Sequence, residues 1–362
     1  MYRILFTLLH SALWGIPVKD AKLTPEQFAK LLRISEKQTV EGLIMKALMD
    51  NNVHLEKHDA VECFTLHEHV AEMNRKITEG LHALCNLLQP AELPFVVVKG
   101  QTFLPLYSNG KSRVPGDIDF YCPAESYDKA KALITEQWQV NWEADEDETV
   151  QHYACQHNGA YYEMHFCLKK FYSSKSQYFF DRLIDDTPYT SRVIDGCEVP
   201  VLQPHLEVLF TFLHLYHHLV GRGVALRQFC DLAILMDKVD YDFDLLHDAL
   251  LQTDHLRAFK AVGAVLVDVL GLPEERFPYP LSKQDYAYVK RLMEIVVHHG
   301  NFGLYGNKHH SRSGWKYYRE ALGNKLSAQW QFYRLAPRES RNTLLRAIPQ
   351  KVFFAARRQN RK

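Results

Sequence analysis

The feature that most constrains the fold of this chain is the segment Gly-Asp-Ile-Asp-Phe at residues 116–120. Side chains at i and i+2 of a strand point to the same face, so Asp117 and Asp119 are expected to lie side by side. Two carboxylates at that spacing repel each other unless a cation neutralises them. The apolar residues 94–98 predict a buried strand that ends at Lys99 and Gly100. A strand ending in Lys-Gly, followed by a strand with Asp-x-Asp, is typical of a site that binds phosphate and metal.

Composition sets outer limits on the kind of protein. With 362 residues the chain can form two or three domains with a sizeable core. Its formal net charge is +0, so no global field attracts nucleic acid or a membrane surface. The seven cysteines are scattered and none forms a Cys-x-x-Cys pair, which argues against a disulfide framework or a zinc knuckle. We therefore expect a cytoplasmic protein in a reducing compartment.

The apolar N-terminus raises the question of a signal peptide. Leucines at 5, 8, 9 and 13 have helical spacing, and His10 interrupts the apolar run. An amphipathic helix over residues 1–14 is therefore favoured over a cleaved signal. No stretch of the chain approaches the roughly 18 apolar residues that a membrane span needs.

The hydrophobic period changes twice along the chain and predicts an α+β protein in three regions. Residues 1–90 have helical periodicity, with a helix start at Thr24-Pro25 and an apolar helix face from Leu66 to Leu88. Residues 91–203 carry the strand signals, and residues 204–362 are helical again and end in a basic tail. We expect a small mixed β-sheet domain flanked by an N-terminal and a C-terminal helical region.

The middle region has its own order of elements. Strands are predicted over 95–98 and 118–122, with a short helix over 102–107 and an amphipathic helix over 126–137. Asn158-Gly159 predicts a hairpin between residues 151–156 and 161–168. Asp195-Gly196 predicts a second hairpin, joining 193–194 to 199–202. The C-terminal region is expected to form helices over residues 206–219, 226–238, 243–251, 256–270 and 283–298.

The strand over residues 161–166 supplies a third carboxylate. Glu163 and His165 share one of its faces, while Tyr162, Met164 and Phe166 share the other and are expected to pack inward. Two-metal phosphoryl transfer uses such a set of acids around two ions about 3.5–4 Å apart. In that chemistry Asp117 and Asp119 bind metal, and Glu163 either completes the second metal site or accepts a proton from an attacking hydroxyl.

The turn that follows the first strand is suited to a polyphosphate. Gly100 permits close approach of the backbone, and the amides that follow it suit anions. Lys99 and Arg113 are candidate charge partners for phosphate oxygens. Lys99 has an alternative reading as a lysine whose ammonium extends from a strand end to solvent.

Taken in order, these segments resemble a known family. Lys99-Gly100, the run from Arg113 through Gly116 to Phe120, and Glu163-x-His165 look like the uncharacterised nucleotidyltransferase family of the DNA polymerase beta-type superfamily. A later segment, residues 214–218 together with Arg227 and Asp231, resembles the helical motif that follows the catalytic domain in that family. The resemblance spans most of residues 25–240.

The resemblance implies a mixed sheet flanked by helices, Mg²⁺ as cofactor (two ions, with Mn²⁺ as an alternative), and nucleotidyl transfer from an NTP. It places Asp117, Asp119 and Glu163 at the metal, and Lys99, Gly100, Arg113 and Gly116 at the nucleotide. His165, His217, Arg227 and Asp231 are candidates for the acceptor side. The chain departs from the wider superfamily by having Lys-Gly in place of Gly-Ser in the turn and glutamate in place of aspartate as third acid.

Several patterns stay open between a functional and a structural role. His214, His217 and His218 have i, i+3, i+4 spacing, but without an intervening Glu or a nearby acid a structural or acceptor-lining role is favoured over zinc. Arg227 and Asp231 can simply pair along a helix. Residues 308–319 mix basic and aromatic side chains as nucleic-acid platforms do, although a solvated loop is favoured, as is a frayed end for the basic tail.

The sequence therefore predicts a Mg²⁺-dependent nucleotidyltransferase whose acceptor is a small molecule, a protein side chain or an RNA end. One alternative is a catalytically weak protein of the same fold that binds or regulates, such as a toxin–antitoxin component. A metal-dependent phosphohydrolase is a further alternative, because His58-Asp59 and His247-Asp248 are present. It is disfavoured because no correctly spaced histidine ligands accompany these dipeptides.

Overall fold

The structure is a computed structural model, and it describes residues 1–19, 21–143, 151–221, 223–300, 323, 326–327 and 330–347. Two segments singled out in the sequence fall outside these residues: the basic and aromatic segment 308–319, and the end of the basic tail from residue 348 on. Among the described residues no helix is both long enough and apolar enough to cross a membrane.

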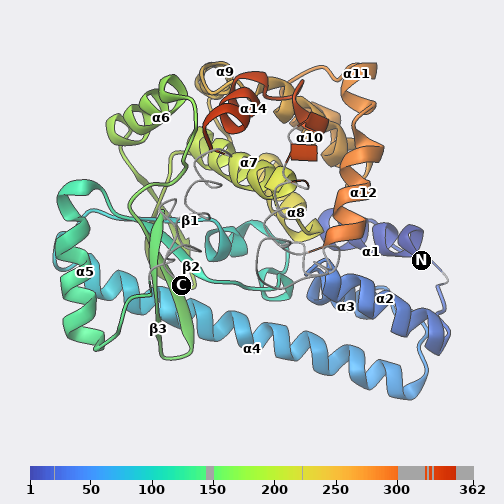
Figure 1. Cartoon of the computed structure of the whole chain (residues 1–362). Helices are drawn as coiled ribbons and strands as arrows, with labels where there is room; N and C mark the ends of the chain where they lie inside the picture. Colours follow the sequence, from blue (N-terminus) through green and yellow to red (C-terminus); the bar gives the residue numbers. More distant parts are fainter. Residues whose placement is uncertain are drawn as a thin grey trace, which may run out of the picture. The chain divides into compact units, whose positions relative to one another are not determined.

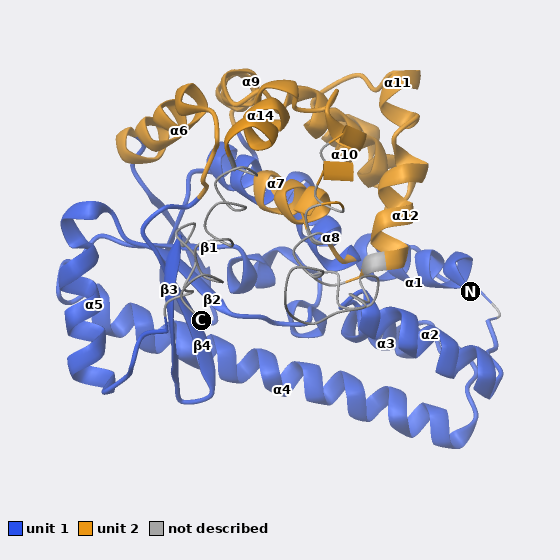
Figure 2. Ribbon diagram, viewed as in Figure 1, with its two compact units in different colours: residues 1–168, 187–211, 226–241 blue, residues 169–186, 212–225, 242–362 orange. Residues whose placement is uncertain are grey.

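The chain forms two compact units, coloured separately in Figure 2. Unit 1 contains residues 1–168, 187–211 and 226–241, and unit 2 contains residues 169–186, 212–225 and 242–362. Unit 1 holds the whole sheet and every strand residue discussed above, so the candidate site belongs to one unit. The division of the sequence into three regions, residues 1–90, 91–203 and 204–362, stays a prediction.

Unit 1 is built on one six-stranded mixed sheet, which confirms the predicted α+β class. Its strands are β1 (Val96–Val98), β2 (Ile118–Tyr121), β3 (His152–His157), β4 (Ala160–His165), β5 (Thr190–Ile194) and β6 (Cys197–Val201). Their order across the sheet is β3-β4-β2-β1-β6-β5. The β2–β4 and β1–β6 pairs are parallel, and the other three pairs are antiparallel. Both predicted hairpins are confirmed, as β3–β4 and β5–β6.

The helices of unit 1 begin with the predicted N-terminal set: α1 (Tyr2–Trp14), α2 (Pro25–Lys37), α3 (Glu41–Asp50) and α4 (Lys57–Leu88). The segment between the first two strands forms η1 (Gly100–Leu106) and η2 (Gly110–Ser112), and α5 (Ala124–Trp138) follows β2. At the start of α2, Thr24 and Gln27 form the capping box that the sequence signal indicates. Figure 1 shows α4, in light blue, running from the strands to the helices α1–α3.

One face of the sheet packs on α4 and α5. The core there contains Phe120, Tyr162 and Met164, all fully buried, together with Leu81 and Leu84 of α4 and Ile134 of α5. Tyr162 donates a hydrogen bond to the carbonyl of Gly80, where a Cβ would lie only 2.8 Å from the phenol oxygen. Burying one face in this way leaves Asp119 and Glu163 on the other face.

Phe166 corrects one expectation. It lies one residue beyond the end of β4 and is 42% exposed, whereas Tyr162 and Met164 are buried as predicted. Strand alternation ends where the ladder ends, so the inward position that period 2 assigns to Phe166 is not kept.

The predicted C-terminal helices are present, with one difference. Those predicted over 206–219, 226–238, 243–251 and 256–270 are α7 (Pro204–Gly221), α8 (Leu226–Lys238), α9 (Phe243–Gln252) and α10 (Leu256–Asp268). The helix predicted over 283–298 is two helices: α11 (Lys283–Tyr286) starts at a Ser282 capping box and ends after one turn, and α12 (Val289–His299) follows. The structure also has elements that were not predicted, namely α6 (Ser174–Asp186), η3 (Glu274–Arg276), α14 (Pro337–Asn342) and η5 (Thr343–Ala347). Helix α8 belongs to unit 1.

Candidate active site

Sheet register brings the predicted acids together on the face opposite α4 and α5. In the parallel β2–β4 pair, Asp119 is the partner of Glu163. In the antiparallel β3–β4 pair, His152 is the partner of His165. Directly opposed residues, and residues two apart on one strand, share a face, so these four side chains form one group.

Short distances join the members of this group. One carboxylate oxygen from each of Asp117, Asp119 and Glu163 lies within 4.8 Å of the other two. The Lys99 Nζ lies 2.7 Å from Asp119 Oδ1. The His165 Nε2 donates to the same oxygen at 2.9 Å. Asp119 is 2% exposed, so its charge depends on these partners rather than on water.

The electrostatics follow from this crowding. The pKa of Asp117 is raised, first by the negative charge of Asp119 and then by burial. For Glu163, burial acts to raise the pKa, but interactions with His165, Lys99 and His152 outweigh it and the pKa is lowered. The pKa of Lys99 is raised because the carboxylates of Asp119, Asp117 and Glu163 outweigh the effect of burial. The group therefore keeps an ammonium beside its carboxylates in the absence of another cation.

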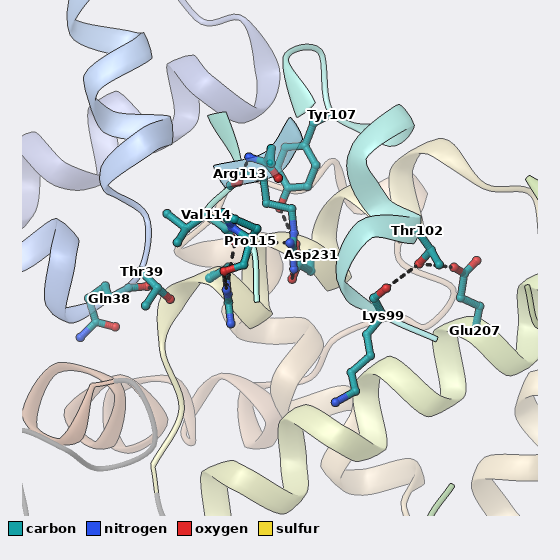
Figure 3. Close-up of polar contacts among 12 residues, drawn as sticks. Gln38, Thr39, Lys99, Thr102, Tyr107, Arg113, Val114, Pro115, Glu207 and Asp231 are labelled. Carbon is teal, nitrogen blue, oxygen red and sulfur yellow. Dashed lines mark hydrogen bonds and ion pairs between the residues drawn. The ribbon is translucent and has the colours of Figure 1, made fainter. Parts of the chain in front are cut away.

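The backbone at Lys99 is held in an unusual conformation. Its φ is +50°, a region that residues other than glycine rarely adopt, and Gly100 follows with φ +58°. The Lys99 carbonyl accepts hydrogen bonds from the backbone N–H and the hydroxyl of Thr102, in the first turn of η1. Figure 3 shows this contact continuing from Thr102 to the buried Glu207.

A buried ion pair supports the first turn of η1. Arg192 of β5 donates both terminal nitrogens to the carboxylate of Glu207 at 2.8 Å, and one of them also donates to the Thr102 carbonyl. Burial raises the pKa of Glu207, while Arg192 acts in the opposite direction. The first turn of η1, and with it Lys99, is thus fixed to β5 and α7.

Helix α8 fixes the other side of the site, ahead of Asp117. Arg113 Nε and Nη2 donate to the two carboxylate oxygens of Asp231 at 2.7 and 2.8 Å, and Tyr107 donates to Asp231 Oδ1 at 2.8 Å. Arg227 Nη1 donates to the carbonyls of Val114 and Pro115 at 2.9 and 3.0 Å. Figure 3 shows Asp231 facing Arg113 and Tyr107. These contacts hold the loop that leads into β2.

The start of α8 is held in turn by the end of α2. The backbone N–H groups of Leu226 and Arg227 donate to the side-chain oxygen and the carbonyl of Gln38. Gln38 is fully buried, and the next residue, Thr39, has φ +51°. Figure 3 labels both residues. The helical region before the sheet therefore helps to position Arg227.

The predicted nucleotide and acceptor residues fall into three sets: one at the acids, one at helix α8, and His217 in unit 2. Lys99 and Gly100 lie at the acids, since a Cβ on Gly100 would approach the Asp117 carbonyl to 3.3 Å. Arg113, Arg227 and Asp231 form the α8 contacts, and Gly116 lies next to the guanidinium of Arg227. His165 joins the acids themselves. His217 lies in unit 2, where its Nδ1 is 3.1 Å from Lys169 Nζ.

Sequence reasoning missed His152. Its Nε2 lies 3.5 Å from Glu163 Oε1, and its ring centroid is 4.8 Å from that of His165. The signal was available: a two-residue Asn158-Gly159 turn fixes the hairpin register, and counting back from it sets residue 152 opposite 165. Tyr107 and Gln38 were also missed, and no local pattern identifies either.

The donor chemistry at the acids fits a hard divalent cation. Asp117, Asp119 and Glu163 offer carboxylate oxygens from adjacent strands, which are the ligands that Mg²⁺ and Mn²⁺ prefer. Asp117 and Asp119 repel each other, so a cation between the two carboxylates stabilises both.

Comparison with known proteins identifies a matching family. The model of a protein family described as uncharacterised nucleotidyltransferase matches residues 24–270. No curated protein matches the chain. A solved structure, an antigenic nucleotidyltransferase-like protein from Paracoccidioides brasiliensis, is similar at 13% identity and a TM-score of 0.36, covering 57% of this chain and 98% of that one. Because the family match spans more than half of its length, the chain belongs to the uncharacterised nucleotidyltransferase family.

Proposed function

We propose that this protein transfers a nucleoside monophosphate from an NTP to a hydroxyl acceptor in a Mg²⁺-dependent reaction. One observation carries the proposal: three carboxylates from two adjacent strands converge within 4.8 Å, with Lys99 directly beside them. Family membership supports the same reaction class.

The acids have separate roles in this proposal. Asp117 and Asp119, with Glu163, hold Mg²⁺ or Mn²⁺. Bound there, two such ions would supply positive charge to the attacking and leaving oxygens of an in-line displacement. The raised pKa of Asp117 reflects a repulsion that a bound cation would relieve, so binding is favoured by the arrangement of the acids themselves.

The acceptor hydroxyl attacks the α-phosphorus, its proton is transferred to a base, and pyrophosphate leaves with the electrons of the broken P–O bond. Glu163 is the candidate base, because its lowered pKa keeps it ionised at neutral pH. Glu163 lies directly opposite Asp119 on the neighbouring strand, so it is beside the two aspartates but on a different strand.

Lys99 is proposed to change partners during the cycle. In the structure its ammonium neutralises Asp119. A cation at Asp119 would release the ammonium, which would then be available to phosphate oxygens of the NTP. The fixed backbone of Lys99 and Gly100 keeps the side chain within reach of both positions.

A catalytically weak binding or regulatory protein is the second candidate. The ion pair between Lys99 and Asp119 favours it, because the pair stabilises the site without any metal. The two candidates differ in one property: the enzyme transfers label from an NTP to an acceptor, and the binding protein does not.

Two measurements test the proposal. Asp117→Asn combined with Asp119→Asn should abolish Mg²⁺-dependent NTP binding while circular dichroism shows an intact fold, and the exposed Asp128→Asn serves as charge-matched control. Unchanged NTP binding in the double variant would refute the metal role of the pair. Each α-labelled NTP is then incubated with the protein, Mg²⁺ and cell extract. Labelled product identifies the acceptor class, and no transfer to any class favours the binding protein.

A further inference from the structure

Two histidines and one carboxylate meet beside the acids, and Glu163 belongs to both groups. His152, Glu163 and His165 each offer a ligand atom, and the three atoms lie within 4.8 Å of one another. His152 Nε2 is 3.5 Å from Glu163 Oε1. Around a tetrahedral ion with ligand distances of about 2.0–2.2 Å, neighbouring ligand atoms lie roughly 3.3–3.6 Å apart. The observed spacing is therefore that of two ligands of one ion.

His165 turns its Nε2 toward the carboxylates. Nε2 lies 2.9 Å from Asp119 Oδ1 and 3.6 Å from Glu163 Oε2. The second distance is again that of two ligands of one tetrahedral ion. An ion bound at Nε2 would replace the hydrogen bond between His165 and Asp119. The residue is only 7% exposed, so its ring is held in place by its surroundings.

The three side chains are positioned by strands rather than loops. His152 and His165 are cross-strand partners in β3 and β4, and Glu163 lies two residues before His165 on the same face. Register and pleat fix their mutual arrangement before any ligand arrives. His152 is the most accessible member, with a side chain 32% exposed, so an ion can reach the group from that side.

We propose that His152, Glu163 and His165 form a second metal site, which shares Glu163 with the acids and takes a late first-row divalent cation of the zinc type. Imidazole nitrogens suit such ions, whereas Mg²⁺ prefers an all-oxygen set. Three protein ligands leave a fourth position for water, as in open zinc sites.

Glu163 is common to this site and to the acid group of Asp117, Asp119 and Glu163. An ion of the zinc type would therefore withdraw one carboxylate from the Mg²⁺ position. Zinc-type ions should therefore inhibit the Mg²⁺-dependent reaction. Their binding should depend on His152 and His165, which the Mg²⁺ position does not use. The site itself does not require that the protein transfer nucleotides.

The test uses Co²⁺ as a spectroscopic substitute for zinc in the full chain, with no nucleotide present. Wild type should show the strong visible absorption of four-coordinate Co²⁺, and added Zn²⁺ should remove it while excess Mg²⁺ should not. His152→Ala should abolish the bands and weaken Zn²⁺ binding by at least about 100-fold, because even the outer partners of ligands contribute roughly 10- to 100-fold. Glu163→Gln and His165→Gln should have the same effect. His152→Ala is the variant that should fold normally, because the His152 side chain is partly exposed.

Two histidine controls test specificity. His157→Ala lies on the same strand but on the opposite face, where its ring stacks on Trp138. His58→Ala removes the histidine of the other histidine-containing group found among the described residues, His58, Asp59 and Glu62. Both should keep the bands. Bands that survive His152→Ala, or that disappear in His58→Ala, would overturn the proposal.

Asp117→Asn separates this site from the proposed enzyme function. It should remove Mg²⁺-dependent NTP binding and leave the Co²⁺ bands in place. Absence of bands in a wild type that transfers nucleotides would overturn the zinc-type site alone. Bands in a protein without transfer activity would support the site and contradict only the proposed function.

Discussion

Arg113 and Asp231 are 118 positions apart in the sequence, and they form a two-pronged ion pair in which both side chains are almost completely buried. Tyr107 adds a third hydrogen bond to the same carboxylate. The pair joins the loop before β2 to helix α8, and so ties the strand that carries Asp119 to that helix.

Breaking this pair should strongly destabilise the protein. Asp231→Leu or Arg113→Met should each lower the free energy of unfolding by about 3–5 kcal/mol, because a buried charge then loses its partner. Denaturant unfolding of the purified protein measures the change. The double variant Arg113→Met with Asp231→Leu should recover much of the loss, since no lone charge stays buried. If the double variant loses the sum of the two single effects, the pair is not the stabilising unit.

Arg227 is expected to act on the site through the backbone. Arg227→Met removes the donor to the Val114 and Pro115 carbonyls. Leaving such groups unpaired costs about 1–3 kcal/mol and loosens the loop before Asp117. Mg²⁺-dependent NTP binding, measured by calorimetry, should weaken although no ion pair joins Arg227 to these acids in the described part of the chain. The exposed Arg75→Met is the control and should change neither property. Full NTP affinity in Arg227→Met would show that the loop keeps its position without it.

Lys99→Met should make the protein respond more strongly to Mg²⁺. The substitution removes the ammonium that neutralises Asp119, so the metal-free protein loses stability. Mg²⁺ then binds without displacing a cation, and the rise in melting temperature on adding Mg²⁺ should exceed that of wild type. NTP affinity should fall at the same time if Lys99 contacts phosphate. Differential scanning fluorimetry with and without Mg²⁺ reports the first effect, with the exposed Lys129→Met as control. Equal Mg²⁺ shifts in variant and wild type would contradict the exchange of partners.

Glu41 should make stability fall as pH rises through neutrality. Burial raises the pKa of its carboxyl to about 7, and Oε2 has no hydrogen-bond partner within the described residues. For an acid whose pKa is higher in the folded state, stability is fully present below the unfolded pKa and is lost as pH rises through the folded pKa. The shift from 4.5 to about 7 corresponds to about 3 kcal/mol.

Glu41→Gln should remove this pH dependence and give a more stable protein than wild type at pH 8. Unfolding midpoints measured from pH 5 to pH 9 check the prediction, with the exposed Glu92→Gln as control. A variant whose midpoints follow the wild-type curve would show that Glu41 does not titrate in this range.

Much of the fold could be predicted from local signals, because these are set by a few neighbouring residues. Asn158-Gly159 and Asp195-Gly196 determine two-residue hairpins, and Thr24 begins α2 with a capping box. Where a local pattern ends, prediction ends with it, as Phe166 shows just beyond β4. The break at Ala287 and Tyr288 divides a helix that apolar periodicity alone would have continued.

The sequence by itself determined that Asp117 and Asp119 share one face of their strand and that Glu163 and His165 share one face of theirs. It also determined that Lys99-Gly100 ends a strand. These statements depend only on strand pleat and chain order. Only the tertiary structure decided that Asp119 pairs with Glu163, that His152 joins them, and that Arg113 meets Asp231. The reason is physical: strand order and the packing of α8 come from burial summed over the whole of unit 1, and no short stretch of residues contains that sum.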